Sequence, residues 1–226
     1  MEKKTKIASL LYEAVVFLLM LAGILYYRPS VFSYIPLLVS VVVMLLQAKV
    51  NRYAFLLGAA NSILYAVAYV KMSLFATALY ALLVSCPLQV ATFLNWKCHT
   101  AKNKTALKHM ANRRRLLLLF CMLGGFAILY AIFLAFDSQY LLLDNAITVL
   151  GIAASVLCLL RFSEYAFLQI ATNGIMLVTF LLMLKTDPSR IIWAINSANA
   201  VISSCLALKN MKKERKETDH GREDHM

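Results

Sequence analysis

The chain has 226 residues, of which 62% are hydrophobic and only 15% are charged, and its formal net charge at pH 7 is +12. An average soluble domain has roughly 45–50% apolar and about 25% charged residues, so this chain has too few charges to cover a water-facing surface. The composition therefore excludes an ordinary soluble protein and predicts an integral membrane protein.

Eight apolar runs follow one another along the chain, separated by charged or turn residues. They cover residues 7–27, 34–48, 53–70, 74–94, 116–136, 140–160, 165–184 and 191–208. A helix needs about 20 apolar residues to cross a bilayer, so we predict an all-α membrane protein of about eight transmembrane helices. The first run is expected to be a retained helix, because Tyr26, Tyr27 and Arg28 stand at its end in place of a signal-peptide cleavage site.

The basic residues are distributed unevenly between the two sides of this predicted bundle. Nineteen of the 23 lysines and arginines lie at the chain ends and in alternate connections, and four lie in the other connections. The positive-inside rule then places both termini in the cytoplasm, with the protein in the cell membrane. Because this asymmetry accounts for the net charge, we expect contact with the lipid bilayer and no nucleic-acid partner.

Part of the third run recurs in the seventh. Residues 53–56 read YAFL, residues 165–168 read YAFL again, and the same offset carries Asn61 onto Asn173. We interpret this as two parallel three-helix repeats, which in transporters enclose the solute site between them. The expected organisation is an N-terminal helix (1–30), repeat 1 (31–96), a basic cytoplasmic loop and linker helix (97–139), repeat 2 (140–209) and a basic cytoplasmic tail (210–226).

Polar side chains inside apolar runs are candidate site residues, because a polar group in hydrocarbon needs a polar partner or a water-filled cavity. Asn61 and Asn173 lie near the middle of their runs, and their amides can both donate and accept hydrogen bonds. They could clamp one solute from two sides. The alternative is hydrogen bonding between helices that serves packing alone.

The eighth run adds a possible binding face for a flat heterocyclic ring. Asn196 and Asn199 are three residues apart, and Trp193 precedes them by one helical turn, which would combine amide hydrogen bonds with stacking. An interfacial tryptophan near the headgroups is the alternative for Trp193. Further substrate-binding candidates in the other runs are Gln169, Tyr80 and Gln89, with a kink expected at Pro87.

Asp144, at the start of the sixth run, is expected to have a structural or a gating role. Its carboxylate could be satisfied by backbone amides at a helix N-terminus, or it could hold the bundle together or control entry. Catalytic chemistry is not indicated: Cys98, His99 and His109 match no usual metal-ligand spacing, and no phosphate-binding loop or nucleophile motif occurs. We therefore expect no catalytic residue, metal or cofactor.

Several of these residues together resemble the PnuC family of bacterial vitamin transporters. The resemblance covers roughly residues 34–209. It rests on the spacing of several short motifs relative to one another and not on any single motif. The residues that carry it are Asn51-Arg52-Tyr53, Gly58, Asn61, Leu74-Phe75-Ala76, Asn95-Trp96, Asp144, Glu164 and Asn173.

The resemblance implies a SWEET-like fold of three plus one plus three helices, often as a homotrimer. It also implies facilitated diffusion of nicotinamide riboside or a related vitamin by alternating access, with trapping through phosphorylation by a cytoplasmic kinase. Asn173 would correspond to the family's central asparagine, and Trp96 to the tryptophan that closes the first repeat.

The chain departs from the family pattern at Ala166 and Gln169, where nicotinamide riboside transporters usually have tryptophans. Thiamine, riboflavin and a deoxynucleoside therefore remain open as substrates. Outside transport, the alternatives are a membrane enzyme acting on lipid-linked substrates, or a scaffold subunit in which the asparagines serve only packing.

Overall fold

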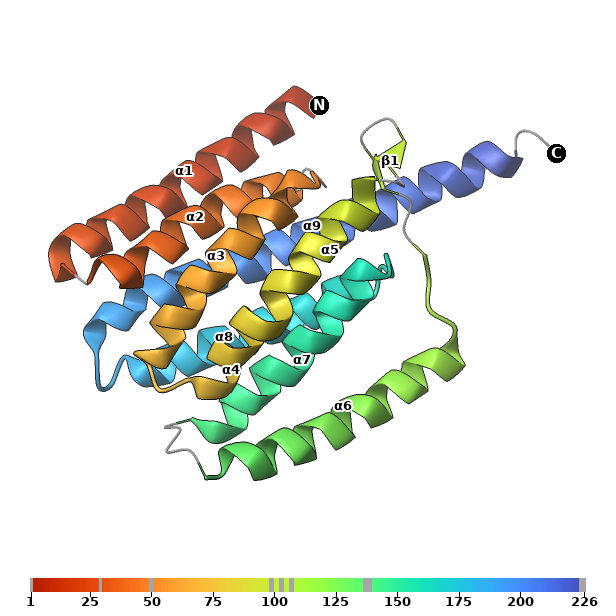
Figure 1. The fold of residues 1–226 in the computed structure, drawn as a ribbon. Coiled ribbons are helices and arrows are strands. Elements are labelled where there is room, and N and C mark those ends of the chain that lie inside the picture. Colours follow the sequence, from red (N-terminus) through yellow and green to blue (C-terminus); the bar gives the residue numbers. More distant parts are fainter. Residues whose placement is uncertain are drawn as a thin grey trace.

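The computed structural model describes residues 2–28, 30–48, 51–97, 100–101, 104–105, 108–135 and 140–223, and these form an elongated helical bundle (Figure 1). Two short strands, β1 (Thr100–Ala101) and β2 (Lys104–Thr105), form an antiparallel pair. The helices are α1 (Glu2–Tyr27), α2 (Val31–Ala48), α3 (Tyr53–Val70), α4 (Phe75–Leu79), the π-helical η1 (Tyr80–Ser85), α5 (Cys86–Lys97), α6 (Asn112–Phe133), α7 (Leu141–Leu159), α8 (Tyr165–Met183), the 3-10 turn η2 (Pro188–Arg190) and α9 (Ile191–Glu223).

Six helical segments of the described chain are long and apolar enough to cross a membrane. They are Tyr53–Val70, Phe75–Asn95, Asn112–Phe133, Leu141–Leu159, Tyr165–Met183 and Pro188–Lys209. Two shorter apolar segments, Ala14–Tyr27 and Ser33–Leu46, correspond to the first two predicted spans. The all-helical membrane fold is confirmed, but six of the eight expected spans reach full length and apolarity.

Three elements differ in extent from the apolar runs that predicted them. The fourth run folds as α4, η1 and α5 in succession, with the π-helical turn just before Pro87. Helix α6 begins at Asn112, so its first turn contains arginines. Helix α9 continues to Glu223 because the basic segment after Lys209 is rich in lysine, arginine and glutamate, which favour helix.

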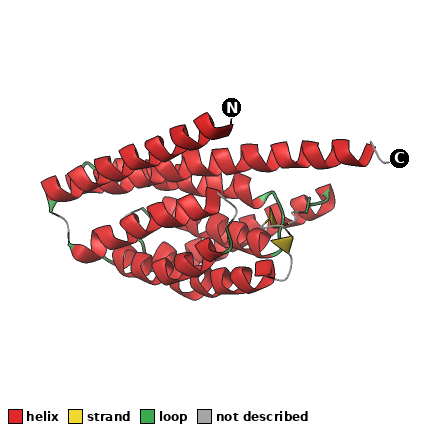
Figure 2. Ribbon diagram, turned by 90° about the horizontal axis from the view of Figure 1, so that it is seen from above, coloured by secondary structure: helices red, strands yellow, loops and turns green. Residues whose placement is uncertain are grey.

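Six helices pack in a closed ring around the centre of the bundle. Going round it, α2 contacts α3, α3 contacts α5, α5 contacts α7, α7 contacts α8, α8 contacts α9, and α9 returns to α2. Helix α1 packs outside the ring on α9 and α2, and α6 lies on its other side against α7 and α4 (Figure 1). Figure 2 shows that the helix axes lie roughly parallel to one another. The ring thus has an inner face that lipid does not reach.

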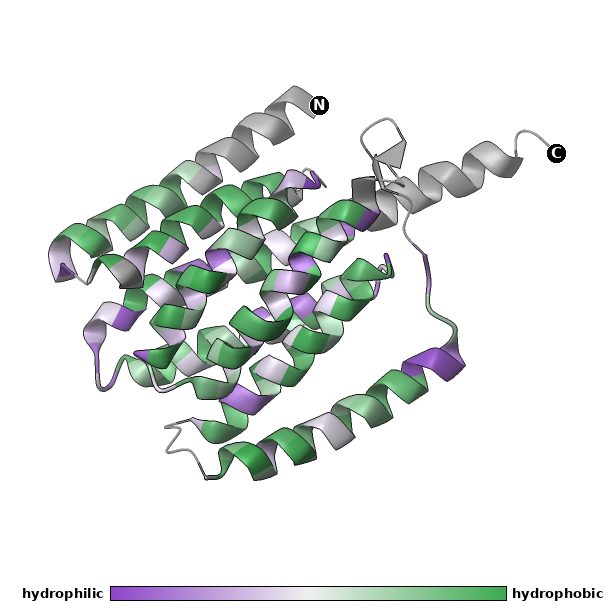
Figure 3. Cartoon of the chain, in the orientation of Figure 1, coloured by the Kyte–Doolittle hydropathy of each residue, from purple (hydrophilic) through white to green (hydrophobic). Residues whose placement is uncertain are grey.

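The main apolar core lies at the end of the ring where α3 and α8 finish and α9 begins. Its fully buried members include Met20, Leu37, Leu74, Phe180 and Ile192. Many exposed side chains are also large and apolar, among them Leu83, Phe120 and Leu142, and most of the helical ribbon in Figure 3 is green. Apolar residues on both the inner and outer sides are what a bundle surrounded by lipid requires.

Candidate functional site

A cavity of about 270 Å³ occupies the centre of the helix ring. Residues of α2, α3, α4, η1, α5, α7, α8 and α9 line it, so every member of the ring contributes. Small-molecule sites usually have volumes of about 300–1,000 Å³, and this cavity is slightly smaller than the lower limit of that range. It is therefore a candidate binding site for one small molecule.

The cavity is long, as its lining on α9 shows. Seven residues of α9 line the cavity, and their spacing places them on one face of the helix. They are Trp193, Asn196, Ser197, Ala200, Ser203, Ser204 and Ala207. At 1.5 Å rise per residue, this stretch extends about 21 Å along the helix axis. The cavity thus continues from the aromatic residues near the start of α9 toward the helix ends near Asn51 and Tyr165.

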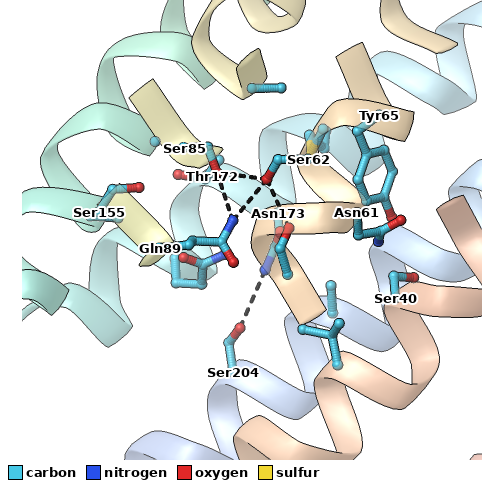
Figure 4. Close-up of a pocket in the computed structure, with 18 of the residues that line it drawn as sticks. Ser40, Asn61, Ser62, Tyr65, Ser85, Gln89, Ser155, Thr172, Asn173 and Ser204 are labelled. Carbon is cyan, nitrogen blue, oxygen red and sulfur yellow. Dashed lines mark hydrogen bonds between the residues drawn. The ribbon is translucent and has the colours of Figure 1, made fainter. Parts of the chain in front are cut away.

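Asn61 on α3 and Asn173 on α8 both line this cavity, from opposite parts of the ring (Figure 4). Asn61 donates from Nδ2 to the Pro36 carbonyl at 3.0 Å, and its buried Oδ1 has no hydrogen-bond partner among the described residues. Asn173 donates from Nδ2 to Ser204 Oγ at 3.2 Å. Each amide is therefore held in place by a neighbouring helix.

Gln89 joins α5 to α3 through a compact polar cluster (Figure 4). Its Nε2 donates to Ser62 Oγ and to Ser85 Oγ, both at 2.8 Å, and the two serine hydroxyls are 3.1 Å apart. Tyr80 lies on the same span, and its hydroxyl donates to the Gly151 carbonyl of α7 at 3.0 Å. Both candidate residues of the fourth run therefore line the cavity.

Aromatic rings close one end of the cavity. Trp193 packs against Tyr65, Tyr69 and Phe180, with ring centroids 5.7, 5.8 and 5.3 Å away. Tyr65 and Tyr69 stack on each other at 5.4 Å. Trp193 is only 3% exposed, so it does not lie at the lipid headgroups as an interfacial tryptophan would.

The two asparagines of α9 have different environments. Asn196 lines the cavity, accepts a hydrogen bond from Ser40 Oγ at 2.6 Å and donates to the Tyr65 hydroxyl at 3.3 Å. Asn199, expected on the same face, is instead buried against α2, where its Nδ2 is 3.5 Å from Met44 Sδ. In an α-helix, side chains three residues apart differ by about 60° in direction around the helix axis. This difference places Asn196 in the cavity lining and Asn199 outside it.

Asp144 lies outside the cavity lining and holds the start of another helix. Its carboxylate accepts hydrogen bonds from the Ala76 and Thr77 N–H groups at 3.0 and 2.9 Å, and from the Thr77 hydroxyl. It is fully buried. The amides it satisfies belong to α4 and not to its own helix α7. Trp96 belongs to α5, but its side chain lies outside the described residues.

No charged residue is found among the described residues that line the cavity. Gln169 and Ala166 line it, and Gln169 remains exposed toward its open space. No group of three or more metal-binding side chains occurs in the described part of the chain. The lining can therefore form hydrogen bonds and stack on rings, but it offers no cation to an anionic group.

The hydroxyl-bearing residues of the lining were not predicted from the sequence. Serine and threonine can return their hydroxyl to a carbonyl one turn back in the same helix, so their sequence alone does not indicate a site. One signal was available: the lining residues of α3 repeat with helical periodicity around Asn61. The missed residues include Ser40, Ser62, Tyr65, Ser85, Ser155, Thr172 and Ser204.

A closed ring of membrane-spanning helices around a polar cavity is the architecture of a transport protein for a small solute. The chain belongs to the nicotinamide mononucleotide transporter family, the PnuC family, because the family's model matches residues 30–207. This is a family of transporters and not of enzymes, which confirms both the family resemblance and the expectation of a non-enzymatic membrane protein.

A solved structure described as the crystal structure of the vitamin B3 transporter PnuC has the same fold. The two structures superpose with a TM-score of 0.67 at 20% sequence identity, over 88% of this chain and 92% of that chain. Comparison with curated proteins gives no significant match.

Proposed function

We propose that this protein lets an unphosphorylated vitamin or nucleoside-like solute, nicotinamide riboside or a related molecule, diffuse across the cell membrane by alternating access. The observation that carries the proposal is the uncharged, amide-lined and hydroxyl-lined cavity with an aromatic end, enclosed by the helix ring. A flat ring would lie against the aromatic residues, while amide and hydroxyl groups would bind the solute's polar edge.

The described lining residues carry no charge, which argues against a phosphorylated solute. Proteins bind phosphate groups with arginine, lysine or clustered backbone amides, because a dianion is costly to remove from water without compensation. The described lining contains none of these cationic side chains. The cavity therefore suits a nucleoside better than a nucleotide, although the family's name refers to a mononucleotide.

The proposed mechanism uses two repeats, α2–α5 and α7–α9, that move relative to each other. Helices α3 and α8 begin at the matched residues Tyr53 and Tyr165. The order of helix contacts is also symmetric, because α2 with α9 and α5 with α7 are the two junctions between the repeats. A site between two such units becomes accessible from alternate sides when one unit rocks against the other.

The test is uptake of labelled nicotinamide riboside, thiamine, riboflavin and thymidine into proteoliposomes, with nicotinamide mononucleotide as the phosphorylated probe. We expect saturable uptake of one of the first four, no uptake of the mononucleotide, and loss of uptake in Asn173→Leu. The matched control is Asn145→Leu, because Asn145 is fully buried outside the cavity lining and neither of its amide atoms has a partner among the described residues.

Uptake of the mononucleotide, or unchanged uptake by Asn173→Leu, would refute the proposed site. Binding can be measured separately in a Trp96→Phe background, where Trp193 is the remaining tryptophan. Because Trp193 lies at the aromatic end of the cavity, its fluorescence should change as the transported solute is added. Homotrimer formation and trapping by a cytoplasmic kinase remain predictions from the family resemblance.

A further inference from the structure

Helix α6 has an apolar groove on its own surface that does not belong to the ring cavity. Arg113, Arg114, Leu116, Leu117 and Phe120 line it. The three apolar members are 56%, 64% and 63% exposed. Figure 3 shows the hydrophilic start of α6 passing directly into an apolar stretch. The groove is therefore cationic at the end nearest the start of α6 and apolar along the rest of its length.

The three successive arginines at the start of α6 differ in their surroundings. Arg115 donates to Glu164 at 2.8 Å and is thereby tied to the start of α8. Arg113 and Arg114 are exposed and have no acidic partner among the described residues. Two adjacent guanidinium groups with free donors make a site for an anion, and planar guanidinium groups bind phosphate oxygens with two parallel hydrogen bonds.

Beyond Phe120, where the groove ends, the outer face of α6 remains apolar and exposed, with Leu123 60% and Ile128 63% exposed. Gly124 lies one helical turn beyond Phe120, and a methyl group placed on it would meet nothing within 4 Å. From Arg113 to Gly124 the helix rises about 17 Å. This is close to half of a bilayer's hydrocarbon thickness, which is roughly 30 Å in total. The groove together with this exposed face of α6 therefore has the length to hold one acyl chain of one leaflet.

We propose that this groove binds one anionic phospholipid, with its phosphate between Arg113 and Arg114 and an acyl chain along Leu117 and Phe120. Charge complementarity selects the occupant: anionic headgroups attract basic residues at the membrane surface, and a zwitterionic lipid lacks the net charge. Because α6 lies outside the ring and contacts mainly α7 and α4, the bound lipid fills its outer face without touching the solute cavity.

The test uses the full chain in native mass spectrometry after delipidation, with phosphatidylglycerol or phosphatidylcholine added back. We expect one phosphatidylglycerol to be retained preferentially, and its affinity to fall about 25-fold in R113Q/R114Q, because each of two basic contacts near a membrane surface contributes about fivefold. Solute uptake in the same variant should persist.

Two matched variants distinguish a specific lipid site from non-specific electrostatic attraction between the protein and anionic lipid. K108Q/K209Q removes two other positive charges, at exposed positions that do not line the groove, and should retain the lipid. R113K/R114K keeps both charges but loses the planar guanidinium geometry and should bind with intermediate affinity.

Equal lipid loss in K108Q/K209Q and R113Q/R114Q would overturn the proposal in favour of diffuse electrostatics. A change of oligomeric state in R113Q/R114Q without any change in retained lipid would overturn it in favour of a second copy of the chain on this face. Full retention in R113Q/R114Q would show that the arginines do not hold the headgroup.

Discussion

Gly58 leaves the space that Gln89 occupies. A methyl group at Gly58 would collide with Gln89 Oε1, so the absence of a side chain on α3 lets the amide of α5 reach Ser62. Gly151 plays the corresponding part for Tyr80, whose ring would be 2.8 Å from an added methyl group. Close approach of helices at small residues thus positions two polar side chains of the fourth span in the cavity.

Replacing Gly58 with alanine should displace Gln89 and weaken solute binding. The new methyl group would break the hydrogen bonds from Gln89 to Ser62 and Ser85, and we expect roughly a tenfold rise in KM from the loss of about 1–2 kcal/mol. The measurement is uptake kinetics in proteoliposomes. Gly174→Ala is the control, since nothing lies within 4 Å of that position, and its KM should not change. A wild-type KM for Gly58→Ala would contradict the positioning of Gln89 by Gly58.

Individual site residues could be predicted from the sequence to different degrees. Asn61 and Asn173 were found because the repeat marks them, and amides in an apolar run are conspicuous. Asn199 was placed on the wrong face, because a spacing of three does not decide which neighbouring helix a side chain meets. Ser62 and Ser85 could not be found, because a serine in an apolar helix is satisfied by its own backbone as easily as by a site.

The span formed by α4, η1 and α5 shows how an element's shape positions the site. Its π-helical turn, Tyr80–Ser85, precedes Pro87, which has no N–H for the helix ladder. Insertion of a residue into a helical turn rotates the side chains that follow, and π-helical turns are frequent at functional sites. The start of the span is held by Asp144 from α7.

Replacing Asp144 with alanine should destabilise the fold. The substitution leaves the buried Ala76 and Thr77 N–H groups without their acceptor, which costs about 2–4 kcal/mol. Asp144→Asn keeps one acceptor oxygen and should lose less than half of that. Thermal unfolding in detergent measures both. If the alanine variant unfolds at the wild-type temperature, the contact with α4 does not stabilise the fold.

The segment before α6 docks on the turn between α7 and α8. The Lys108 N–H donates to the Arg161 carbonyl at 2.7 Å, and the Ser163 N–H donates to the Lys108 carbonyl at 2.9 Å. Glu164 accepts hydrogen bonds from the Met110 N–H and from Arg115. Burial by itself raises the pKa of Glu164, but these hydrogen bonds and the charge of Arg115 bring its pKa below the ordinary 4.5.

This contact should weaken in acid. Because the pKa of Glu164 is lowered in the folded state, its stabilising effect is present at neutral pH and is lost as the pH falls below 4.5 through the folded-state pKa. Glu164→Gln should lose about 1 kcal/mol at pH 7 and show a smaller further loss in acid than the wild type. Unfolding temperatures of both proteins at pH 7 and pH 4 measure this. An equal acid-induced decrease in both would assign the effect to other carboxylates.

At the scale of the whole molecule, the two ends of the cavity differ. The aromatic end is sealed by Trp193, Phe180 and Tyr69, which are all at most 5% exposed. The other end is lined by partly exposed residues such as Asn51, Ser203 and Ala207. With both termini in the cytoplasm, as the charge asymmetry predicts, we expect this conformation to be closed on the outer side and accessible from the cytoplasmic side.

Cysteine labelling can test this orientation. In a background without the native cysteines, Lys71→Cys should react with a membrane-impermeant thiol reagent in intact cells, because it follows α3 on the predicted outer side. Lys108→Cys should react only after permeabilisation, because it lies on the predicted cytoplasmic side. The reverse pattern would invert the topology, and it would leave the cavity geometry unchanged.

The sequence by itself determined that the protein is helical and lies in a membrane, approximately where its apolar helices lie, and that Asn61 and Asn173 occupy matching positions in two similar segments. These properties follow from composition, apolar run length and local repetition, which are all encoded along the chain. Only the tertiary structure decided that α9 returns to α2 to close the ring, that Asp144 holds α4, and which hydroxyls line the cavity. These depend on how each helix is rotated about its axis, which is fixed by packing against residues distant in the sequence.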